Sequence, residues 1–344
     1  MTAQPCQRDG CTSVTQSKPG NDGLVLCRGC RTEQNKLDRM PTGIDRIPKA
    51  SQGWYRDKLT GAKLRRVTTI LENGVPKPAL PFWSGNVCTD SAIEHLPELV
   101  YASRYPEKLR EMRDFIRRAH TRKKDERADI GSAVHTIIES IVLGQPIPDD
   151  LLNDPEMAVY LDNFLRFCKE CEVEFRASEM VVGNYEAGYA GTLDYILRSP
   201  LLVRLIRFQL PKLFAGETPP EIDDYADLLG DTKTGGELDE VVQSGGPKGV
   251  YPEAGLQMSG YRHAKVCWLK PSGDRVDMPP TAPVGIVLHL RPEGYRVYPI
   301  RCDEAVYERF LYAMEVDRWT AGLAKTVLGP ALSIPDRTTV RGAA

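Results

Sequence analysis

The pattern of hydrophobic and polar positions predicts helices followed by a small group of strands in the middle of the chain. Apolar residues recur at helical intervals between Glu107 and Gly144 and again between Pro155 and Cys171. Three shorter runs are typical of strands: FRASEMVVG, AGTLDYIL and DLLGDTKT. Residues 201–227 separate the last two strands and exceed the length of a hairpin loop, so we expect an insertion there.

The pattern predicts further elements towards the C-terminus. Residues 252–269 are expected to form a helix, PVGIVLHLRP and GYRVYPIR a β-hairpin, and residues 303–323 a closing helix. Residues 36–66 are polar and broken by Pro and Gly, which predicts a basic linker. We therefore expect a main domain over residues 67–325 and a C-terminal tail over residues 326–344.

Four cysteines predict a separate zinc module over residues 1–35. They form two pairs, Cys6-x4-Cys11 and Cys27-x2-Cys30. Four thiolates at this spacing can surround a structural zinc ion, and so short a segment needs such bonds to fold. A catalytic zinc would need an open coordination position, which nothing beside the cysteines suggests. Four unrelated thiols are the alternative.

Composition narrows the class of protein. The chain has 344 residues, of which 41% are hydrophobic, enough for a substantial packed core. No stretch approaches the roughly 20 apolar residues of a membrane span, and the polar start MTAQPCQRDG lacks a signal-peptide core. We therefore expect a cytoplasmic protein whose nine cysteines are thiols or metal ligands.

The net charge of the chain does not indicate nucleic-acid binding, but the charge of one segment does. A formal net charge of -2 gives no general attraction to polyanions, so contact with nucleic acid needs a basic patch. The segment from Arg104 to Arg127 holds ten Lys or Arg against five Asp or Glu, and it leads into the helical run IGSAVHTIIESIVLG. A solvated helical face would have the same composition.

Candidate chemistry begins with an acid and a lysine two residues apart. Side chains alternate along a strand, so Asp231 and Lys233 project to the same side. Asp194 lies among apolar neighbours, where an unpaired carboxylate is costly. Two converging carboxylates repel each other unless a cation separates them or one holds a proton, and oxygen ligands favour Mg²⁺ or Mn²⁺. His135 and Glu139 share a helix face, so the imidazole can join the metal while Glu139 orients it or a bound water.

Each signal taken alone has a structural explanation, because a single helical histidine is commonly a core or capping residue and Asp-x-Lys occurs by chance in strands. Their order along the chain is more specific. Over about residues 67–320 the chain resembles the RecB-like branch of the PD-(D/E)XK nucleases. The motifs that carry the resemblance are GSAVHTIIE, Glu179, GTLD, GDTK and Gln257-x3-Tyr261.

The resemblance implies an α/β fold, with a restriction-endonuclease-like mixed central sheet flanked by helices. It also implies that Lys233 positions or activates the attacking water, and that Gln257 and Tyr261 face the nucleic-acid strand. Glu179 matches an acidic position of the family, although a surface carboxylate or a salt-bridge partner stays an alternative. The implied ligands of the catalytic metal are His135, Asp194, Asp231 and the backbone carbonyl of Thr232.

Some relatives of this kind hold an iron-sulfur cluster through one cysteine before the histidine motif and three after the Gln-Tyr helix. Here Cys88 lies upstream, but only Cys267 and Cys302 follow that helix. Cys168-x2-Cys171 lies elsewhere, between the histidine and GTLD motifs. We therefore expect no cluster and interpret these cysteines as structural thiols.

The expected function is Mg²⁺- or Mn²⁺-dependent hydrolysis of DNA phosphodiester bonds, with structural Zn²⁺ in the N-terminal module. By analogy the activity is that of an exonuclease in recombination, repair or phage DNA replication, in a bacterial cell or phage-infected host. DNA is the expected partner, with a recombination or replication protein as a further candidate. The alternative is a noncatalytic zinc-containing DNA-binding or adaptor protein on a nuclease fold.

Overall fold

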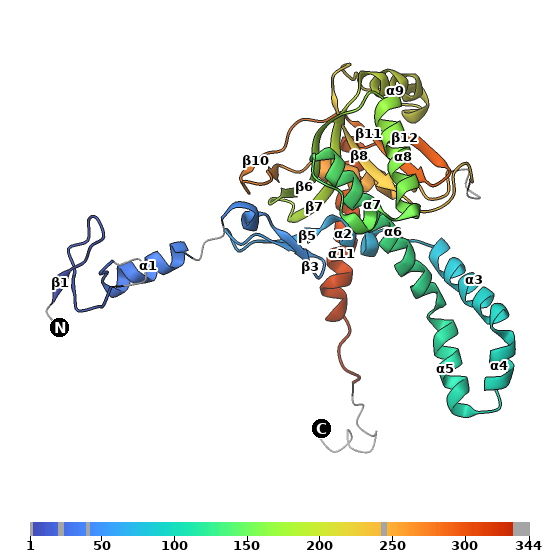
Figure 1. Ribbon diagram of the computed structural model, residues 1–344, viewed down its shortest axis with the longest axis horizontal. Coiled ribbons are helices and arrows are strands. Elements are labelled where there is room, and N and C mark those ends of the chain that lie inside the picture. Colours follow the sequence, from blue (N-terminus) through green and yellow to red (C-terminus); the bar gives the residue numbers. More distant parts are fainter. Residues whose placement is uncertain (1–2, 20–23, 39–41, 242–245, 333–344) are drawn as a thin grey trace, which may run out of the picture.

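The computed structural model describes residues 3–19, 24–38, 42–241 and 246–332. Its centre is a mixed, ten-stranded sheet, which confirms the expected α/β class with helices flanking a mixed sheet (Figure 1). At the middle of the sheet, β6 (Glu174–Asn184) and β7 (Tyr189–Arg198) form a long antiparallel hairpin. The strands beyond β7 are β8 (Asp227–Lys233), β11 (Val284–Arg291) and β12 (Gly294–Arg301). β8 is antiparallel to β7 and parallel to β11, and β11 and β12 form the predicted hairpin.

The edge of β7 that faces away from β6 has two different partners. β8 pairs with Tyr195 to Arg198, the C-terminal end of β7. At the other end, β5 (Lys63–Arg66) runs parallel to β7 and pairs with Tyr189 and Ala190. The residues of GTLD lie between these two partners. Among the described residues, no strand therefore pairs with this edge of β7 at Asp194 and the three residues before it.

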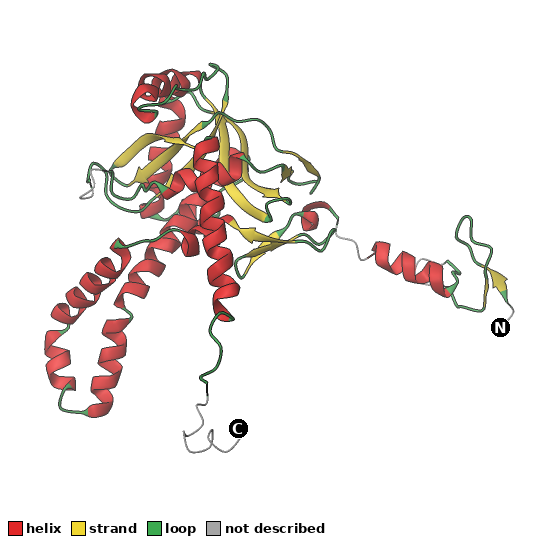
Figure 2. Cartoon of the chain, turned by 180° about the vertical axis from the view of Figure 1, so that it is seen from behind, coloured by secondary structure: helices red, strands yellow, loops and turns green. Residues whose placement is uncertain are grey.

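Helices cover both faces of the sheet (Figure 2). On one face Val134, Phe164 and Val203 pack with Tyr195 and Ile286 of the sheet. The helices of this layer are α6 (Ala119–Val142), α7 (Asp149–Leu152), α8 (Pro155–Glu170) and α9 (Pro200–Leu213). The opposite layer packs on Leu193, Ile196 and Val287, and consists of α2 (Val67–Gly74), α10 (Glu253–Arg262) and α11 (Glu304–Ala321).

Two segments fold differently from the sequence expectation. The linker expected over residues 36–66 is in part β-sheet, because β3 (Lys49–Ser51), β4 (Trp54–Arg56) and β5 form an antiparallel meander joined to β7. These strands are too short to show a hydrophobic period. The insertion expected over residues 201–227 contains α9, which buries one apolar side against the sheet.

The helix expected over residues 252–269 is shorter in the structure and ends at Arg262. The apolar residues after it form β9 (Val266–Trp268), which pairs with β6 and with the edge strand β10 (Arg275–Asp277). Here the sheet ladder, rather than a helix, satisfies the backbone hydrogen bonds of an apolar run. The predicted helices over 107–144, 155–171 and 303–323 are present, the first of them divided at Arg118.

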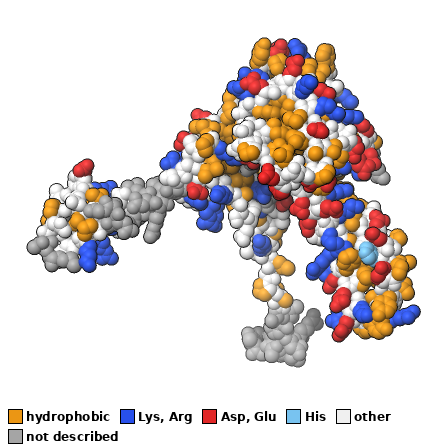
Figure 3. Space-filling view, viewed as in Figure 1, with side chains coloured by type: hydrophobic (Ala, Val, Ile, Leu, Met, Phe, Trp, Pro, Cys, Tyr) orange, Lys and Arg blue, Asp and Glu red, His pale blue; other side chains and the backbone are white. Residues whose placement is uncertain are grey.

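Two parts of the chain extend from this body (Figures 1 and 2). The helical arm, residues 79–117, consists of α3 (Ala79–Glu94), α4 (Leu96–Ala102) and α5 (Pro106–Arg117), and returns to the sheet through α6. Hydrophobic side chains gather on its surface (Figure 3), among them the exposed Phe82, Ile93 and Tyr101.

The N-terminal part contains β1 (Gln4–Pro5), β2 (Val14–Thr15) and α1 (Arg28–Asp38). Short 3-10 turns lie at Gly43–Arg46 and Leu323–Lys325. Of the expected zinc module, residues 1–2 and 20–23 lie outside the described residues, as do residues 333–344 of the expected tail.

Candidate functional site

The open edge of β7 forms one side of a pocket of about 630 Å³. Helices from both layers line this pocket, because α6 belongs to the layer on one face of the sheet and α10 to the layer on the other. Elements far apart in the sequence contribute to it, among them α6, β6, β7, β8 and α10. Every side chain implicated by the resemblance lines this one pocket: His135, Glu179, Asp194, Asp231, Lys233, Gln257 and Tyr261.

Three of these residues form a possible metal site. One ligand atom from each of His135, Glu179 and Asp194 lies within 4.8 Å of the others. His135 Nδ1 is 3.6 Å from Glu179 Oε1 and 3.7 Å from Asp194 Oδ2. Glu179, for which the sequence left a surface or salt-bridge role open, is thus the third member of the cluster. An imidazole nitrogen and two carboxylates form a donor set compatible with Mn²⁺ or Mg²⁺.

The backbone brings the two carboxylates together. Ser178 is opposite Tyr195 and Met180 is opposite Leu193, so Glu179 and Asp194 face each other on adjacent strands. The alternation of side chains is interrupted there, because Leu193 and Ile196, three residues apart, pack into the same core cluster. Glu179 also has a φ of +45°, a left-handed conformation that L-residues seldom adopt. The irregularity directs both acids into the pocket.

Asp231 contacts the lysine of its own strand rather than the three-residue cluster. Its Oδ1 accepts hydrogen bonds from Lys233 Nζ at 2.8 Å and from Gln257 Nε2 at 3.1 Å. Its Oδ2 is buried and accepts no well-oriented hydrogen bond from a described residue, although Lys233 Nζ is 2.7 Å away. Asp231 and Lys233 therefore share one side of the strand, as alternation predicts, and the Lys233 ammonium lies against both carboxylate oxygens.

The electrostatics indicate an excess of negative charge. Burial and the nearby Asp231 carboxylate raise the pKa of Asp194 to about 7. Burial lowers the pKa of His135, but the carboxylates of Asp194 and Glu179 outweigh burial and raise it to about 9. For Lys233, too, burial lowers the pKa, and Asp231 and Asp194 outweigh it and raise the pKa above its ordinary value. A bound cation fits this surplus of carboxylates.

Thr232 and Glu139 make contacts that the sequence did not specify. The Thr232 backbone N–H donates to Asp194 Oδ2 at 2.7 Å, just beyond the last paired residues of β7 and β8. Its carbonyl as a metal ligand stays a prediction. Glu139 lines the pocket but accepts a hydrogen bond from Lys270 Nζ at 2.7 Å, which directs it away from orienting the imidazole.

The second helix layer supplies the Gln-Tyr pair. Gln257 Nε2 donates to the Tyr261 hydroxyl at 3.2 Å as well as to Asp231. The Tyr261 ring packs directly over β7 at Gly191, where an added Cβ would stand 2.3 Å from the nearest ring atom. Glycine at position 191 thus permits α10 to approach the sheet closely enough for Gln257 to reach Asp231.

The four N-terminal cysteines form a second possible metal site. One sulfur atom each from Cys6, Cys11, Cys27 and Cys30 lies within 4.8 Å of the others, which is consistent with structural zinc. Hydrogen bonds from Ser13 lower the pKa of Cys11 to about 6, so its thiolate forms readily. The other five cysteines join no such group in the part of the chain that the structure describes.

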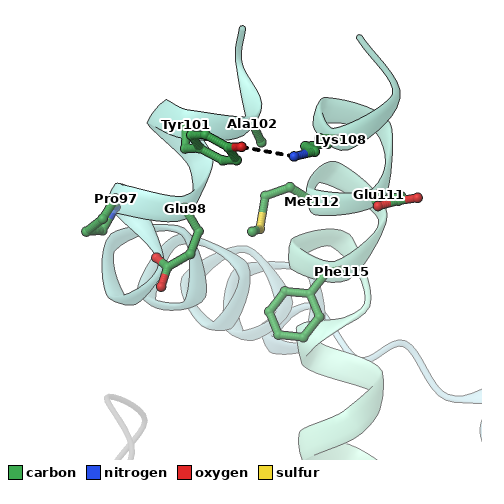
Figure 4. Close-up of a pocket in the computed structure, with 8 residues that line it drawn as sticks. All are labelled: Pro97, Glu98, Tyr101, Ala102, Lys108, Glu111, Met112 and Phe115. Atoms are coloured by element: carbon green, nitrogen blue, oxygen red, sulfur yellow. Dashed lines mark hydrogen bonds between the residues drawn. The ribbon is translucent and has the colours of Figure 1, made fainter. Parts of the chain in front are cut away.

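A second pocket, of about 580 Å³, lies in the helical arm between α4 and α5 (Figure 4). Tyr101, Met112 and Phe115 face one another across it, and Lys108 donates to the Tyr101 hydroxyl at 3.0 Å. No group of metal-ligating side chains among the described residues lies there. The chemistry therefore points to the pocket at β7.

Sequence reasoning missed one wall of that pocket. The meander β3–β5 and the start of α2 contribute Ala50, Tyr55, Arg66 and Thr68, and Thr192 of β7 binds the Tyr55 hydroxyl at 2.8 Å. Only the β-pairing that joins β5 to β7 brings these residues to the site. The run KLRRVTT beside it, basic and then β-branched, was the available signal.

The chain matches no protein-family model and no curated protein. In the described residues, no helix has both the length and the apolar character to cross a membrane.

Proposed function

We propose that the chain is a divalent-metal-dependent deoxyribonuclease of the RecB-like PD-(D/E)XK type. One observation carries the proposal: the side chains of five short motifs, spread over residues 131–261, line a single pocket. A set of motifs that matched only by chance would be scattered over the surface. The donor set and the surplus of carboxylates support a Mg²⁺ or Mn²⁺ ion there.

His135, Glu179 and Asp194 would hold the ion, and Asp231, which lines the same pocket, would be a further donor. When bound, the ion would supply a water of lowered pKa and positive charge for the phosphoryl oxygens. Lys233, fixed by its ion pair with Asp231, presents an ammonium group to the phosphate. Gln257 donates to Asp231 Oδ1, which also accepts from Lys233, and so limits the rotation of this carboxylate.

Exonuclease activity in recombination, repair or phage DNA replication follows from the resemblance alone. The decisive experiment is incubation of end-labelled linear and circular DNA with and without Mn²⁺. We expect metal-dependent degradation that requires a DNA end. A protein that binds DNA but cuts neither substrate would favour the adaptor alternative.

The isosteric variants Asp194→Asn and Asp231→Asn test the site. Each removes one carboxylate charge and should lower the rate by roughly 100-fold or more. Asp239→Asn is the matched control, because Asp239 forms an exposed ion pair with Arg296 outside the pocket. Full activity of a well-folded Asp231→Asn protein would contradict the proposal.

A further inference from the structure

Arg66 is a cation on the pocket wall that the proposed metal chemistry does not use. It is the last residue of β5 and directly precedes α2. Leu64 and Arg66 point to one face of the sheet and Arg65 to the other, where Arg65 pairs with Asp317. This alternation directs Arg66 into the pocket that Tyr55 also lines, and the Arg66 charge opposes the rise in the Tyr55 pKa that burial causes.

The other cationic side chains that line the pocket already have carboxylate partners. Lys233 pairs with Asp231, and Glu139 pairs with Lys270. His135 lies between the remaining two carboxylates. The Arg66 guanidinium, by contrast, has no hydrogen bond or ion pair with any residue that the structure describes. It is exposed, so its charge is available to a ligand that enters the pocket.

The register defines where such a ligand would lie. Arg66 is paired with Ala190, four residues before Asp194 on β7. Four strand residues span roughly 13 Å, about twice the reach of an arginine side chain. The guanidinium therefore contacts a group beside the metal site rather than the reacting atoms themselves. For a polyanionic strand, that group is a neighbouring phosphate, which a guanidinium binds through two parallel hydrogen bonds.

We infer that Arg66 binds a backbone phosphate of the DNA strand next to the one that is cut, and that the meander β3–β5 is a wall of the substrate channel. The inference rests on the proposed function. It assigns a binding role to a segment that the sequence presents as a linker.

DNA binding without added divalent ions tests the contact separately from cleavage. We expect Arg66→Gln to weaken binding of a fluorescent oligonucleotide roughly fivefold to tenfold and to reduce the slope of log K against log salt by about 1. Arg66→Lys should keep most of the slope. Arg56→Gln is the matched control, because Arg56 is exposed on the same meander outside the pocket, and it should change binding less than twofold.

Cleavage kinetics give the second readout. A phosphate contact present in both ground and transition states predicts that Arg66→Gln raises KM roughly fivefold to tenfold with little change in kcat. An Arg66→Gln protein that behaves like Arg56→Gln in both assays would overturn the inference while leaving the nuclease proposal intact. Arg66-dependent DNA binding by a wild-type protein that cleaves nothing would support the phosphate contact of Arg66 but refute the nuclease proposal on which the rest of the inference depends.

Discussion

Glu179 combines a strained backbone with a position in the possible metal site. Its φ of +45° costs about 1–2 kcal/mol relative to ordinary strand geometry. That conformation is maintained by the long β6–β7 hairpin on either side, and it turns the carboxylate towards His135. Strain of this kind is concentrated at functional sites, where the surrounding fold overdetermines an unfavourable conformation.

The strain can be measured by comparing two substitutions at the same position. In an ordinary strand, alanine is more stable than glycine by about 0.5–1 kcal/mol. At Glu179 we expect the reverse: Glu179→Gly should have the higher free energy of unfolding, by about 1 kcal/mol, because glycine tolerates positive φ. Urea denaturation measures the difference. The same pair of substitutions at Ser178 should show the ordinary order, and an alanine preference at Glu179 would argue against strain.

At this scale much of the site was predictable. A two-residue spacing in a strand and a four-residue spacing in a helix determine which side chains share a face, so Asp231 with Lys233 and Gln257 with Tyr261 could be paired from sequence. The positive φ of Glu179 and the contact of Thr232 N–H with Asp194 could not, because both depend on how neighbouring strands are aligned.

Among the elements, α10 and β7 are in unusually close contact. The Tyr261 ring occupies the space that a side chain at position 191 would need. Helix and strand patterns predicted both elements, but their separation depends on the absence of one Cβ. The pattern also missed the split edge of β7, because the pairing of short, polar β5 with a distant strand leaves no local signal.

Gly191→Ala tests this contact. The added methyl group should displace Tyr261 and destabilise the protein by about 1–3 kcal/mol. It should also lower the proposed nuclease activity, since Gln257 would lose its position against Asp231. Gly85→Ala on α3, where no atom lies within 4 Å of the new Cβ, is the control and should raise stability by about 0.5–1 kcal/mol. Equal stability of the two variants would exclude the proposed close packing.

The buried pair Arg65–Asp317 joins β5 to α11 and predicts a dependence of stability on pH. Burial raises the pKa of Asp317, but hydrogen bonds from Arg65 and Asn73 outweigh burial and hold it below its ordinary value. The unfolded chain therefore binds this proton more readily than the folded one. The stabilisation is complete above the unfolded pKa of about 3.9 and is lost as pH falls through the lower, folded pKa.

Asp317→Ala should cost about 3–5 kcal/mol of unfolding free energy at pH 7, because it leaves Arg65 without its buried partner. The difference from wild type should shrink below about pH 4, which denaturation at several pH values can follow. Glu315→Ala removes an exposed partner of Arg318 on the same helix and should cost less than about 1 kcal/mol. A difference that does not change with pH would contradict this account.

At the scale of the whole molecule, the pocket at β7 belongs to the sheet, whereas the N-terminal cysteine module and the helical arm extend away from the sheet. The N-terminal cysteine module lies apart from the sheet in both views (Figures 1 and 2), and the helical arm extends in a different direction. Cysteine spacing predicted the module directly, because a structural zinc site requires cysteine or histidine ligands at short, characteristic spacings in the sequence. The arm had no such signature, because its α3 has apolar residues on several sides rather than on one stripe.

We expect about one zinc ion per chain by elemental analysis, lost in Cys27→Ser/Cys30→Ser. The control is Cys168→Ser/Cys171→Ser, which changes an equally spaced pair on α8 and its C-terminus and should keep the zinc. Because the module stands apart, its loss should alter unfolding of the main domain by less than about 0.5 kcal/mol. Zinc retained after loss of Cys27 and Cys30 would refute the assignment.

The 24-residue helix α6 begins at the base of the arm and carries His135 in its C-terminal half. It is roughly 36 Å long and unbroken, so a movement of its N-terminal end is transmitted along its whole length. The two acids opposite His135, Glu179 and Asp194, belong to strands of the sheet, whereas His135 belongs to this helix. A movement of the arm would therefore displace His135 relative to Glu179 and Asp194, the other two members of the possible metal site.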